Sequence, residues 1–501
     1  MQSTEAILDT PNDWDLSRPA RDFLSSKTFG HFIDGQDVQS ASGETFAVLD
    51  PATGREFARC AAGGAEDVER AVRAARAAFD DGRWRNLEPL EKERRLRRLG
   101  ELIEQNRDLL MDLDVVDGGL VRAYSEFIVK FGQDAVAYYS GWPTKLHGEM
   151  PACPPDVVVQ EVREPVGVCG VITPWNGPSA APAGIVPALA CGNSVVLKPA
   201  EQTPLAALVT ARLCLEAGIP AGVVNVVQGF GEVVGAALVA HPLVDTISFT
   251  GSGDTGRRIQ AAAAPTLKRV SMELGGKSPQ IVFDDADLDA AATAVAAAVW
   301  GHSGQVCTAG TRVLVQRGIH DELVAAMVAR SRDIRLGSGF AKDTQMGPLV
   351  SQEQLDRVSR YVGIGRKEGA QVVLGGERHG QAGYFHQPTI FTGVDNRMTI
   401  AREEIFGPVM AVIPFDTEEQ AIAIANDTDF GLAAGVWTRD LARAHRLTQA
   451  IRAGTVWVNT YQRVYPSIPY GGVKQSGYGR NLGAPSLDHY TQTKTVWVKI
   501  R

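Results

Sequence analysis

Short apolar runs alternate with helical stretches over residues 166–283. The runs that predict strands are residues 166–173, 194–197, 223–227, 246–249 and 280–283, with alanine-rich helices expected after the second and third. Such β-α-β alternation predicts a parallel sheet with helices on both faces. Ligands of these sheets bind beyond the carboxyl ends of the strands, so we expect functional residues directly after the apolar runs.

The flanking regions carry shorter patterns. Residues 32–35 and 47–54 predict short strands, and two amphipathic helices should follow them. A second α/β region is expected over residues 274–475, with a helix at 287–300 near its start. Residues 496–500 alternate apolar and polar side chains, which predicts a strand whose edge needs a partner.

Composition narrows the class of protein. With 501 residues and 44% hydrophobic content, the chain can bury a core large enough for two or more domains. A net charge of −8 without a lysine/arginine stripe argues against nucleic-acid binding. Residues 1–24 are polar and lack a signal-peptide core, and no apolar stretch reaches membrane-spanning length. We therefore expect a cytoplasmic protein without membrane association.

One cysteine stands apart from the others. The six cysteines form no C-x-x-C pair and the nine histidines no His-x-x-x-His pair, so neither a disulfide framework nor a metal site is expected. Cys307 lies among small residues in the segment GHSGQVCTAGTR, at the end of an alanine-rich helical run. Upstream, Glu273 in MELGGKS precedes a Gly-Gly turn that allows close backbone approach. Together they suggest a nucleophile and a base.

Candidate binding residues follow the predicted strands. Asn176 in TPWNGP offers an amide for a developing oxyanion, or it forms a turn. Lys198 and Glu201 in KPAE suit the hydroxyls of a nucleotide ribose, or a surface turn. Ser252 in FTGSG precedes a helix and suits a phosphate, although glycine turns after strands are common. The segment 229–235, GFGEVVG, is not the G-x-G-x-x-G fingerprint.

The order of these motifs resembles the NAD(P)-dependent aldehyde dehydrogenase superfamily over nearly the whole length. Further matching motifs are FIDG at 32–35, EIFGP at 404–408, PYGGVKQSG at 469–477 and YT at 490–491. By this resemblance, the Cys307 thiolate attacks the aldehyde, and the Asn176 side chain and the Cys307 N–H hold the oxyanion. Hydride then leaves for the nicotinamide, and Glu273 activates the water that hydrolyses the thioester.

The resemblance also assigns a cofactor site. Lys198 and Glu201 would contact the adenosine ribose, Trp175 and Ser252 the pyrophosphate, and Glu404 with Phe406 the nicotinamide riboside. The remaining expected cofactor residues are Thr173, Gly231, Phe249, Gly251 and Leu274. A carboxylate at Glu201 would repel a 2′-phosphate by roughly 1 to 4 kcal/mol at about 4 Å, so NAD is expected rather than NADP.

The chain departs from its relatives at several positions. Gly177 replaces a common phenylalanine, Gly184 and Ile185 replace an aromatic residue and a lysine, and Asn481 replaces a glutamate, which puts a local salt bridge in doubt. His302 replaces a common asparagine. A cysteine–histidine hydrolase is the alternative that His302 raises, and a packing or hydrogen-bonding role is the favoured interpretation.

The two glycines predict a wide tunnel and a bulky aldehyde, aromatic or long and branched. The expected substrate-binding residues are Gly177, Gly184, Val306, Thr308, Arg463, Tyr465 and Tyr470. One interpretation of Arg463 is pairing with a substrate carboxylate, and a solvated loop arginine is the favoured interpretation.

The expected fold is α/β and aldehyde-dehydrogenase-like. It comprises a Rossmann-like NAD-binding domain over 25–140 and 161–273, a catalytic domain over 274–475, and a small β oligomerisation element over 141–160 and 487–501. A homodimer or homotetramer follows by resemblance. Two alternatives remain: a CoA-acylating semialdehyde dehydrogenase, against which Glu273 counts, and a catalytically inactive binding protein with the same fold, against which intact Cys307, Glu273 and Asn176 count.

Overall fold

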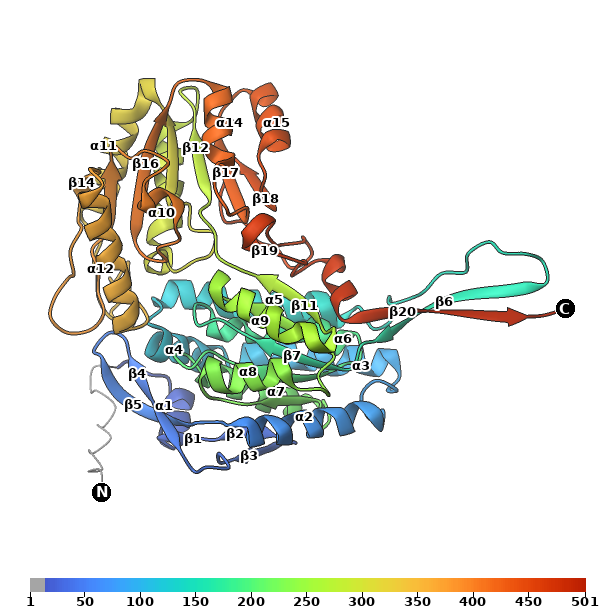
Figure 1. Cartoon of the computed structure of the whole chain (residues 1–501). Coiled ribbons are helices and arrows are strands. Elements are labelled where there is room, and N and C mark those ends of the chain that lie inside the picture. The colour runs from blue at the N-terminus through green and yellow to red at the C-terminus, as the bar shows by residue number, and fades with distance from the viewer. Residues whose placement is uncertain (1–13) are drawn as a thin grey trace.

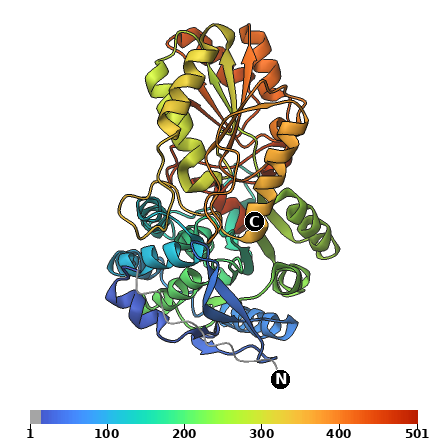
Figure 2. The ribbon, with the colours of Figure 1, turned by 90° about the vertical axis from the view of Figure 1, so that its left-hand side faces the viewer.

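The computed structural model describes residues 14–501 of the chain. Of the polar leader, residues 1–13 lie outside this range. Within it the strands form four sheets, two of them large. Figure 1 shows the two large sheets with their helices as two stacked bodies, from which a narrow ribbon projects to one side, and the quarter turn of Figure 2 shows the same stacking.

The first body contains an eight-stranded sheet, here called the large sheet. Its strands, in spatial order, are β19 (Gly477–Tyr478), β11 (Arg269–Glu273), β10 (Thr246–Thr250), β7 (Val168–Ile172), β8 (Ser194–Lys198), β9 (Val224–Val226), β2 (His31–Ile33) and β3 (Gln36–Val38). The five strands from β11 to β9 are parallel, and each of the flanking strands β19, β2 and β3 is antiparallel to its inner neighbour. The parallel sheet expected from the apolar runs is therefore present.

Apolar cores lie on both faces of the large sheet because alternate strand residues point to opposite sides. Val171 and Leu197 join one core, and Val168 and Val196 join the other. The helices whose side chains complete the first core are α3 (Pro89–Gln105), α4 (Arg107–Gly118), α5 (Arg122–Ser140), α6 (Ala181–Ala190) and α7 (Leu205–Glu216). Those of the second are α2 (Ala65–Asp80), α8 (Ala236–Ala240) and α9 (Gly253–Ala263).

The second body contains a seven-stranded sheet, here called the second sheet. Its strands, in spatial order, are β14 (Gln371–Leu374), β15 (Thr389–Thr392), β16 (Val409–Phe415), β13 (Arg312–Gln316), β12 (Pro279–Val282), β17 (Ala433–Trp437) and β18 (Thr455–Val458). All neighbouring pairs are parallel except β14 with β15. Ile281 and Val282 point into different cores, so this sheet is also covered on both faces.

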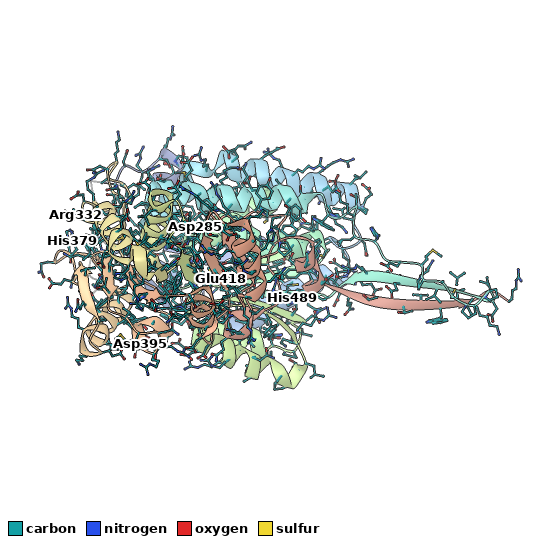
Figure 3. The ribbon with its side chains drawn as sticks, turned by 90° about the horizontal axis from the view of Figure 1, so that it is seen from above. Asp285, Arg332, His379, Asp395, Glu418 and His489 are labelled. Atoms are coloured by element: carbon teal, nitrogen blue, oxygen red, sulfur yellow. The ribbon has the colours of Figure 1, made fainter. Side chains whose placement is uncertain are left out.

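Helices cover the second sheet on each side. They are α10 (Leu288–Trp300), α11 (His320–Ser331), α12 (Gln352–Lys367), α13 (Thr399–Arg402), α14 (Glu418–Asn426) and α15 (Leu441–Ala450). Asp287 caps α10 by accepting from the Ala290 N–H at 3.1 Å, so the helix begins where the sequence predicts. On one rim, Arg443 contacts the carboxylates of Asp285 and Glu418, two of the residues labelled in Figure 3.

The ends of the chain add two smaller sheets. Near the N-terminus, α1 (Arg18–Leu24) precedes a three-stranded sheet of β1 (Thr28–Phe29), β5 (Arg55–Ala61) and β4 (Thr45–Asp50). The projecting ribbon is an antiparallel pair of β6 (Val157–Pro165) and β20 (Thr491–Lys499). The partner expected for residues 496–500 is thus β6, which runs past the predicted boundary at residue 160. His489 lies where the ribbon leaves the body and is hydrogen-bonded to Thr246 at 2.8 Å (Figure 3).

Two expectations about the elements were wrong. The apolar run 280–283 belongs to the second sheet as β12, because the chain crosses between bodies at Gly275 and Gly276, directly after β11. The sequence Arg269–Glu273 gave no apolar run, since it mixes polar and apolar residues, yet it forms the strand that takes this place in the large sheet. Four helices follow the first strands, whereas two were expected. The sequence did not predict α4 because three buried aspartates, Asp112, Asp114 and Asp117, interrupt its apolar face.

Candidate active site

Cys307 lies in a strained loop that follows α10. The backbone turns through three residues with positive φ, His302 at 48°, Ser303 at 54° and Gly304 at 72°. Residues other than glycine rarely adopt this conformation, which costs on the order of 1 kcal/mol or more for each. The Ser303 hydroxyl donates to the Gly347 carbonyl at 2.6 Å. Tertiary contacts of this kind hold the turn that presents the cysteine.

Asn176 lies in the loop after β7 and is tied to the cysteine loop. Its Nδ2 donates to the backbone carbonyl of Gln305 at 2.9 Å. Gln305 is itself buried, and its Oε1 accepts from the Val350 N–H at 2.9 Å. Because an amide nitrogen carries two hydrogens, the second N–H of Asn176 remains for an oxyanion near Cys307.

The Cys307 sulfur lies 3.2 Å from the hydroxyl of Tyr470. Burial raises the pKa of the Cys307 thiol to about 11; the hydrogen bond from Tyr470 opposes this shift, and the charges of Glu273 and Glu404 add to it. A thiol of this kind is largely protonated at neutral pH. Reaction at a carbonyl therefore requires that the thiol first lose its proton.

Glu273 is the last residue of β11 and is only 4% exposed. Within residues 14–501 neither carboxylate oxygen has a hydrogen-bond partner. Burial raises the pKa of Glu273 well above its usual range, against the charge of Arg480 and the nearby backbone N–H of Asn481. A Cβ on Gly471 would come within 2.6 Å of Oε1, so glycine leaves the room that the carboxylate needs. A buried carboxyl of raised pKa without partners is suited to accept a proton.

The predicted cofactor residues gather at the ends of strands in the large sheet. Thr173 and Trp175 follow β7. Lys198 is the last residue of β8, and its Nζ donates to Glu201 Oε2 at 2.8 Å. Ser252 follows β10 and caps α9, where its hydroxyl oxygen accepts from a backbone N–H of the first turn at 3.3 Å. The N-terminus of an eleven-residue helix thus opens beside these strand ends.

Other predicted cofactor residues lie close to the same strand ends. Phe249 is buried in β10, and a Cβ on Gly251 would collide with its ring. Gly231 faces open space, since no atom of a non-adjacent residue within 14–501 lies within 4 Å of the place where its Cβ would be. Leu274 follows β11, and its N–H donates to the Ser476 carbonyl at 3.0 Å.

Glu404 and Phe406 reach this region from the second body. Glu404 Oε1 accepts from the Gly276 N–H at 3.0 Å, and burial raises the pKa of Glu404 to about 7. Phe406 has φ of 60° and packs edge-to-face against Trp175 at a centroid distance of 5.2 Å. The Gln354 amide donates to the Phe406 carbonyl at 2.7 Å and helps to hold this conformation.

Comparison with known proteins identifies this arrangement. The model of the aldehyde dehydrogenase family matches residues 38–496. An aldehyde dehydrogenase of Aspergillus niger is 44% identical over 502 residues, covering 100% of this chain and 99% of the relative. The chain belongs to the aldehyde dehydrogenase family. The family and the enzyme class expected from the sequence are confirmed.

Solved structures of aldehyde dehydrogenases confirm the fold class. An NAD+ complex of the Bacillus cereus aldehyde dehydrogenase gives a TM-score of 0.96 at 43% identity and covers 97% of this chain and 100% of that chain. A P. syringae indole-3-acetaldehyde dehydrogenase mutant in complex with NAD+ and IAA gives 0.92 at 44% identity, with 94% and 96% covered. The expected cofactor, NAD, is also confirmed for this aldehyde dehydrogenase.

The strand-end residues fit this cofactor. Glu201, 27% exposed and held by Lys198, offers carboxylate oxygens to ribose hydroxyls. The start of α9 offers backbone N–H groups to phosphates, and the open space beside Gly231 leaves room for a ligand. Among the described residues, no group of three or more side chains suitable for a metal ion occurs, and no helix is long and apolar enough to cross a membrane.

The predicted substrate residues do not all lie together. Val306 and Thr308 flank Cys307, and the Tyr461 hydroxyl donates to the Thr308 carbonyl at 2.9 Å. Tyr470 contacts the sulfur. Arg463 and Tyr465 are exposed in the loop after β18, and the Arg463 carbonyl accepts from the Trp457 indole at 3.0 Å. These two side chains extend into solvent.

The two glycines of the expected wide tunnel face different surroundings. A Cβ on Gly177 would lie 3.6 Å from Ile128, a buried residue of α5 that occupies part of the space beside it. A Cβ on Gly184 would meet Thr173 and Val171 at 3.6 Å, so this position faces the end of β7. Of the two glycines, only Gly177 would direct a Cβ toward α5.

The other departures have local explanations. Ile185 is fully buried in the core of the large sheet. Asn481 pairs with Tyr470 through two backbone hydrogen bonds of 2.7 Å. His302 is buried, which lowers its pKa to about 3, and stacks on Tyr124 at 5.2 Å. Its ring packs against an aromatic neighbour, as the favoured interpretation expects.

Sequence reasoning missed several residues of this aldehyde dehydrogenase site. Tyr124 and Ile128 come from α5, which was not predicted, although the aromatic spacing of Tyr124, Phe127 and Phe131 was a readable signal. Lys277 is buried, its Nζ has no hydrogen-bond partner within residues 14–501, and burial lowers its pKa to about 7. No sequence signal distinguishes it from an exposed lysine.

Proposed function

We propose that this aldehyde dehydrogenase oxidises its substrate to the carboxylic acid through a thiohemiacetal and a thioester on Cys307. The thiolate attacks the carbonyl carbon, and the free N–H of Asn176 and the Cys307 N–H stabilise the oxyanion. Bound NAD supplies the acceptor for the hydride. Glu273 then takes a proton from the water that attacks the thioester, and Cys307 leaves as a thiolate. The Asn176–Gln305 hydrogen bond carries this proposal, because it ties the oxyanion donor to the cysteine loop.

Water, rather than CoA, is the proposed acyl acceptor. A base is needed to activate water, whereas a thiol acceptor is already nucleophilic when ionised. Glu273 has the burial, raised pKa and free oxygens that this role requires. Adding CoA should therefore produce no acyl-CoA, and formation of acyl-CoA at the rate of NADH would refute the hydrolytic route.

The proposed substrate is a bulky aldehyde, and an aromatic one is favoured by a row of rings that runs from α5 to the catalytic loop. In order along the row, these are Phe131, Phe127, Tyr124, His302, Trp175 and Phe406. Neighbouring centroids lie 5.2 to 6.4 Å apart. Phe127 is exposed, so the row connects the surface to the site. A substrate ring can pack against such rings in edge or offset geometry.

Relatives point in the same direction without deciding the substrate. One similar structure is an indole-3-acetaldehyde dehydrogenase, and others are betaine aldehyde dehydrogenases. Aromatic rings also bind quaternary ammonium groups, so a cationic aldehyde is the competing candidate. The test is a comparison of kcat/KM for an aromatic aldehyde, acetaldehyde and a trimethylammonium aldehyde. We expect the aromatic aldehyde to exceed both by about tenfold.

Variants make this test specific. Tyr124→Leu should lower kcat/KM for the aromatic aldehyde about five- to tenfold and leave a long aliphatic aldehyde within about twofold, since it removes a ring from the row. Tyr138→Leu, on the same helix but packed on Trp142, is the matched control and should change neither. Equal losses with both aldehydes, or preference for the cationic aldehyde, would overturn the aromatic proposal.

We further propose that the domains divide as expected from the sequence, except that the ribbon segment extends to Pro165 at the end of β6, and that the β6–β20 ribbon mediates a homodimer or homotetramer. A two-stranded ribbon leaves an outer edge on each strand unpaired. It also exposes apolar side chains, of which Trp497 is 64% exposed. Trp497→Glu should shift the mass measured by light scattering to a smaller species; an unchanged mass would argue against assembly through this face.

A further inference from the structure

The hydroxyl of Tyr470, which the sequence predicts to contact substrate, contacts the nucleophile instead. It lies 3.2 Å from the Cys307 sulfur. The backbones of Tyr470 and Asn481 exchange two N–H to carbonyl hydrogen bonds of 2.7 Å. These bonds hold the backbone that carries the Tyr470 ring. The next residue, Gly471, packs against Glu273. A single short segment therefore contacts both the nucleophile and the base of the proposed reaction.

The direction of this hydrogen bond follows from the two groups. Burial raises the pKa of Tyr470 well above its usual range, and the neighbouring Cys307 and Glu273 act in the same direction, so the phenol keeps its proton. A neutral phenol next to a thiolate can only donate. Hydrogen bonds to a charged acceptor are about twice as strong as neutral ones, so the contact strengthens when the sulfur is ionised.

We propose that Tyr470 is a catalytic residue whose hydroxyl donates to the Cys307 sulfur each time the sulfur carries negative charge. This inference rests on the proposed function, in which Cys307 is the nucleophile. Charge is present on the sulfur before it attacks the aldehyde and again when the thioester carbon–sulfur bond breaks. Between these points the sulfur is bonded to carbon and is a weak acceptor, so the donor favours the ionised states.

Proton balance is kept without transfer from Tyr470. The thiol proton leaves to solvent water before the sulfur attacks, and Tyr470 retains its own. When the thioester is hydrolysed, Glu273 accepts a proton from the attacking water and later releases it to solvent, and Tyr470 again donates to the departing thiolate. Each turnover therefore returns the hydroxyl unchanged.

A hydrogen-bond donor to the thiolate lowers the nucleophilicity of the sulfur, but by less than it raises the ionised fraction. Lowering a thiol pKa by one unit raises the ionised fraction about tenfold at pH values below the pKa, while nucleophilicity falls only about threefold. Because burial raises the Cys307 pKa to about 11, the site operates in this regime. Stabilising the thiolate thus increases the rate of attack.

The test measures the thiol directly. The titratable groups that influence the sulfur or are influenced by it are Glu273, Glu404, Tyr124, Tyr461 and Tyr470. The variant Tyr470→Phe removes one hydroxyl and keeps the ring, so packing is maintained. Alkylation of Cys307 by iodoacetamide, followed by mass spectrometry from pH 6 to 10 on the full chain with NAD present, reports the ionised fraction. We expect alkylation to slow about three- to tenfold below the thiol pKa and its pH profile to move to higher pH.

Tyr139→Phe is the matched control, because it removes a buried hydroxyl that contacts Ser486 away from the site. Its alkylation profile should equal that of the unaltered protein. The inference is overturned if Tyr470→Phe leaves the profile unchanged, or if it raises KM without changing kcat or alkylation, as a substrate contact would. The proposed function has a separate test, and it fails if Cys307→Ala retains turnover. If Cys307→Ala is inactive and the alkylation profile of Tyr470→Phe is unchanged, only the role of Tyr470 is refuted.

Discussion

The two bodies that meet at the active site position their residues in different ways. In the large sheet, parallel strands in register bring Ile172, Lys198 and Glu273 to one edge. In the second body, Cys307 and Phe406 lie in loops with positive φ rather than on strands. Strand ends are held by a ladder of hydrogen bonds, whereas strained loops are held by contacts from other segments. The catalytic loop should therefore be the more sensitive region.

Substituting the nucleophile in the loop should give the largest loss of activity of any change in either region. We expect Cys307→Ala to lower NADH formation by at least about 10³-fold, because the variant cannot form the thiohemiacetal. NAD affinity, measured by fluorescence titration, should remain within about threefold, since the predicted cofactor residues are all unchanged in this variant. Substantial turnover in this variant would contradict the nucleophile assignment.

Glu273→Gln tests the proposed base, which lies at the end of β11 but acts on the thioester carried by the Cys307 loop. Water activation should slow about 10²- to 10³-fold, so a pre-steady-state burst of NADH should precede a slow steady state. Burial raises the pKa of Glu273, so its carboxyl becomes a base only as the pH rises through that raised value. The unaltered rate should rise with pH and the variant rate stay flat. Loss of the burst would assign Glu273 to an earlier step.

A pair of glycine substitutions compares the regions directly. Gly304 has φ of 72° and its Cβ would overlap the Gly407 carbonyl, while Gly231 on the cofactor side faces open space. Gly304→Ala should destabilise the protein by about 2 kcal/mol or more and lower kcat about ten- to 100-fold by displacing the cysteine loop. Gly231→Ala should change stability by less than about 0.5 kcal/mol. Thermal unfolding and kcat of the two variants measure these effects. Equal losses in both variants would contradict the greater sensitivity of the cysteine loop.

The smallest expected effect concerns cofactor choice at the strand ends. The unaltered enzyme should prefer NAD, and Glu201→Gln should narrow the ratio of kcat/KM between NAD and NADP about tenfold, because it removes repulsion of a 2′-phosphate. The fold should be unaffected, since the Glu201 side chain is 27% exposed and pairs with Lys198 at the edge of the site. Equal use of both cofactors by the unaltered enzyme would refute the role of Glu201.

Much of the fold was predictable because it depends on local patterns. The apolar runs at β7, β8, β9 and β10 identify parallel strands, and the motifs around Cys307 and Glu273 identify the family. The strand β11 was missed, because its position between neighbours rather than its composition makes it a strand. The substrate side was least predictable: Gly177 and Gly184 read alike in the sequence but face α5 and β7 respectively.

The sequence by itself determined the family, NAD as cofactor and the candidate nucleophile, base and oxyanion donor, because these depend on residue types in a fixed order. Tertiary structure decided which groups meet. It placed the Tyr470 hydroxyl on the Cys307 sulfur and Ile128 beside Gly177, and it buried the Glu273 carboxylate. These contacts join residues far apart in the chain, and burial depends on everything packed around a side chain, so no local pattern records them.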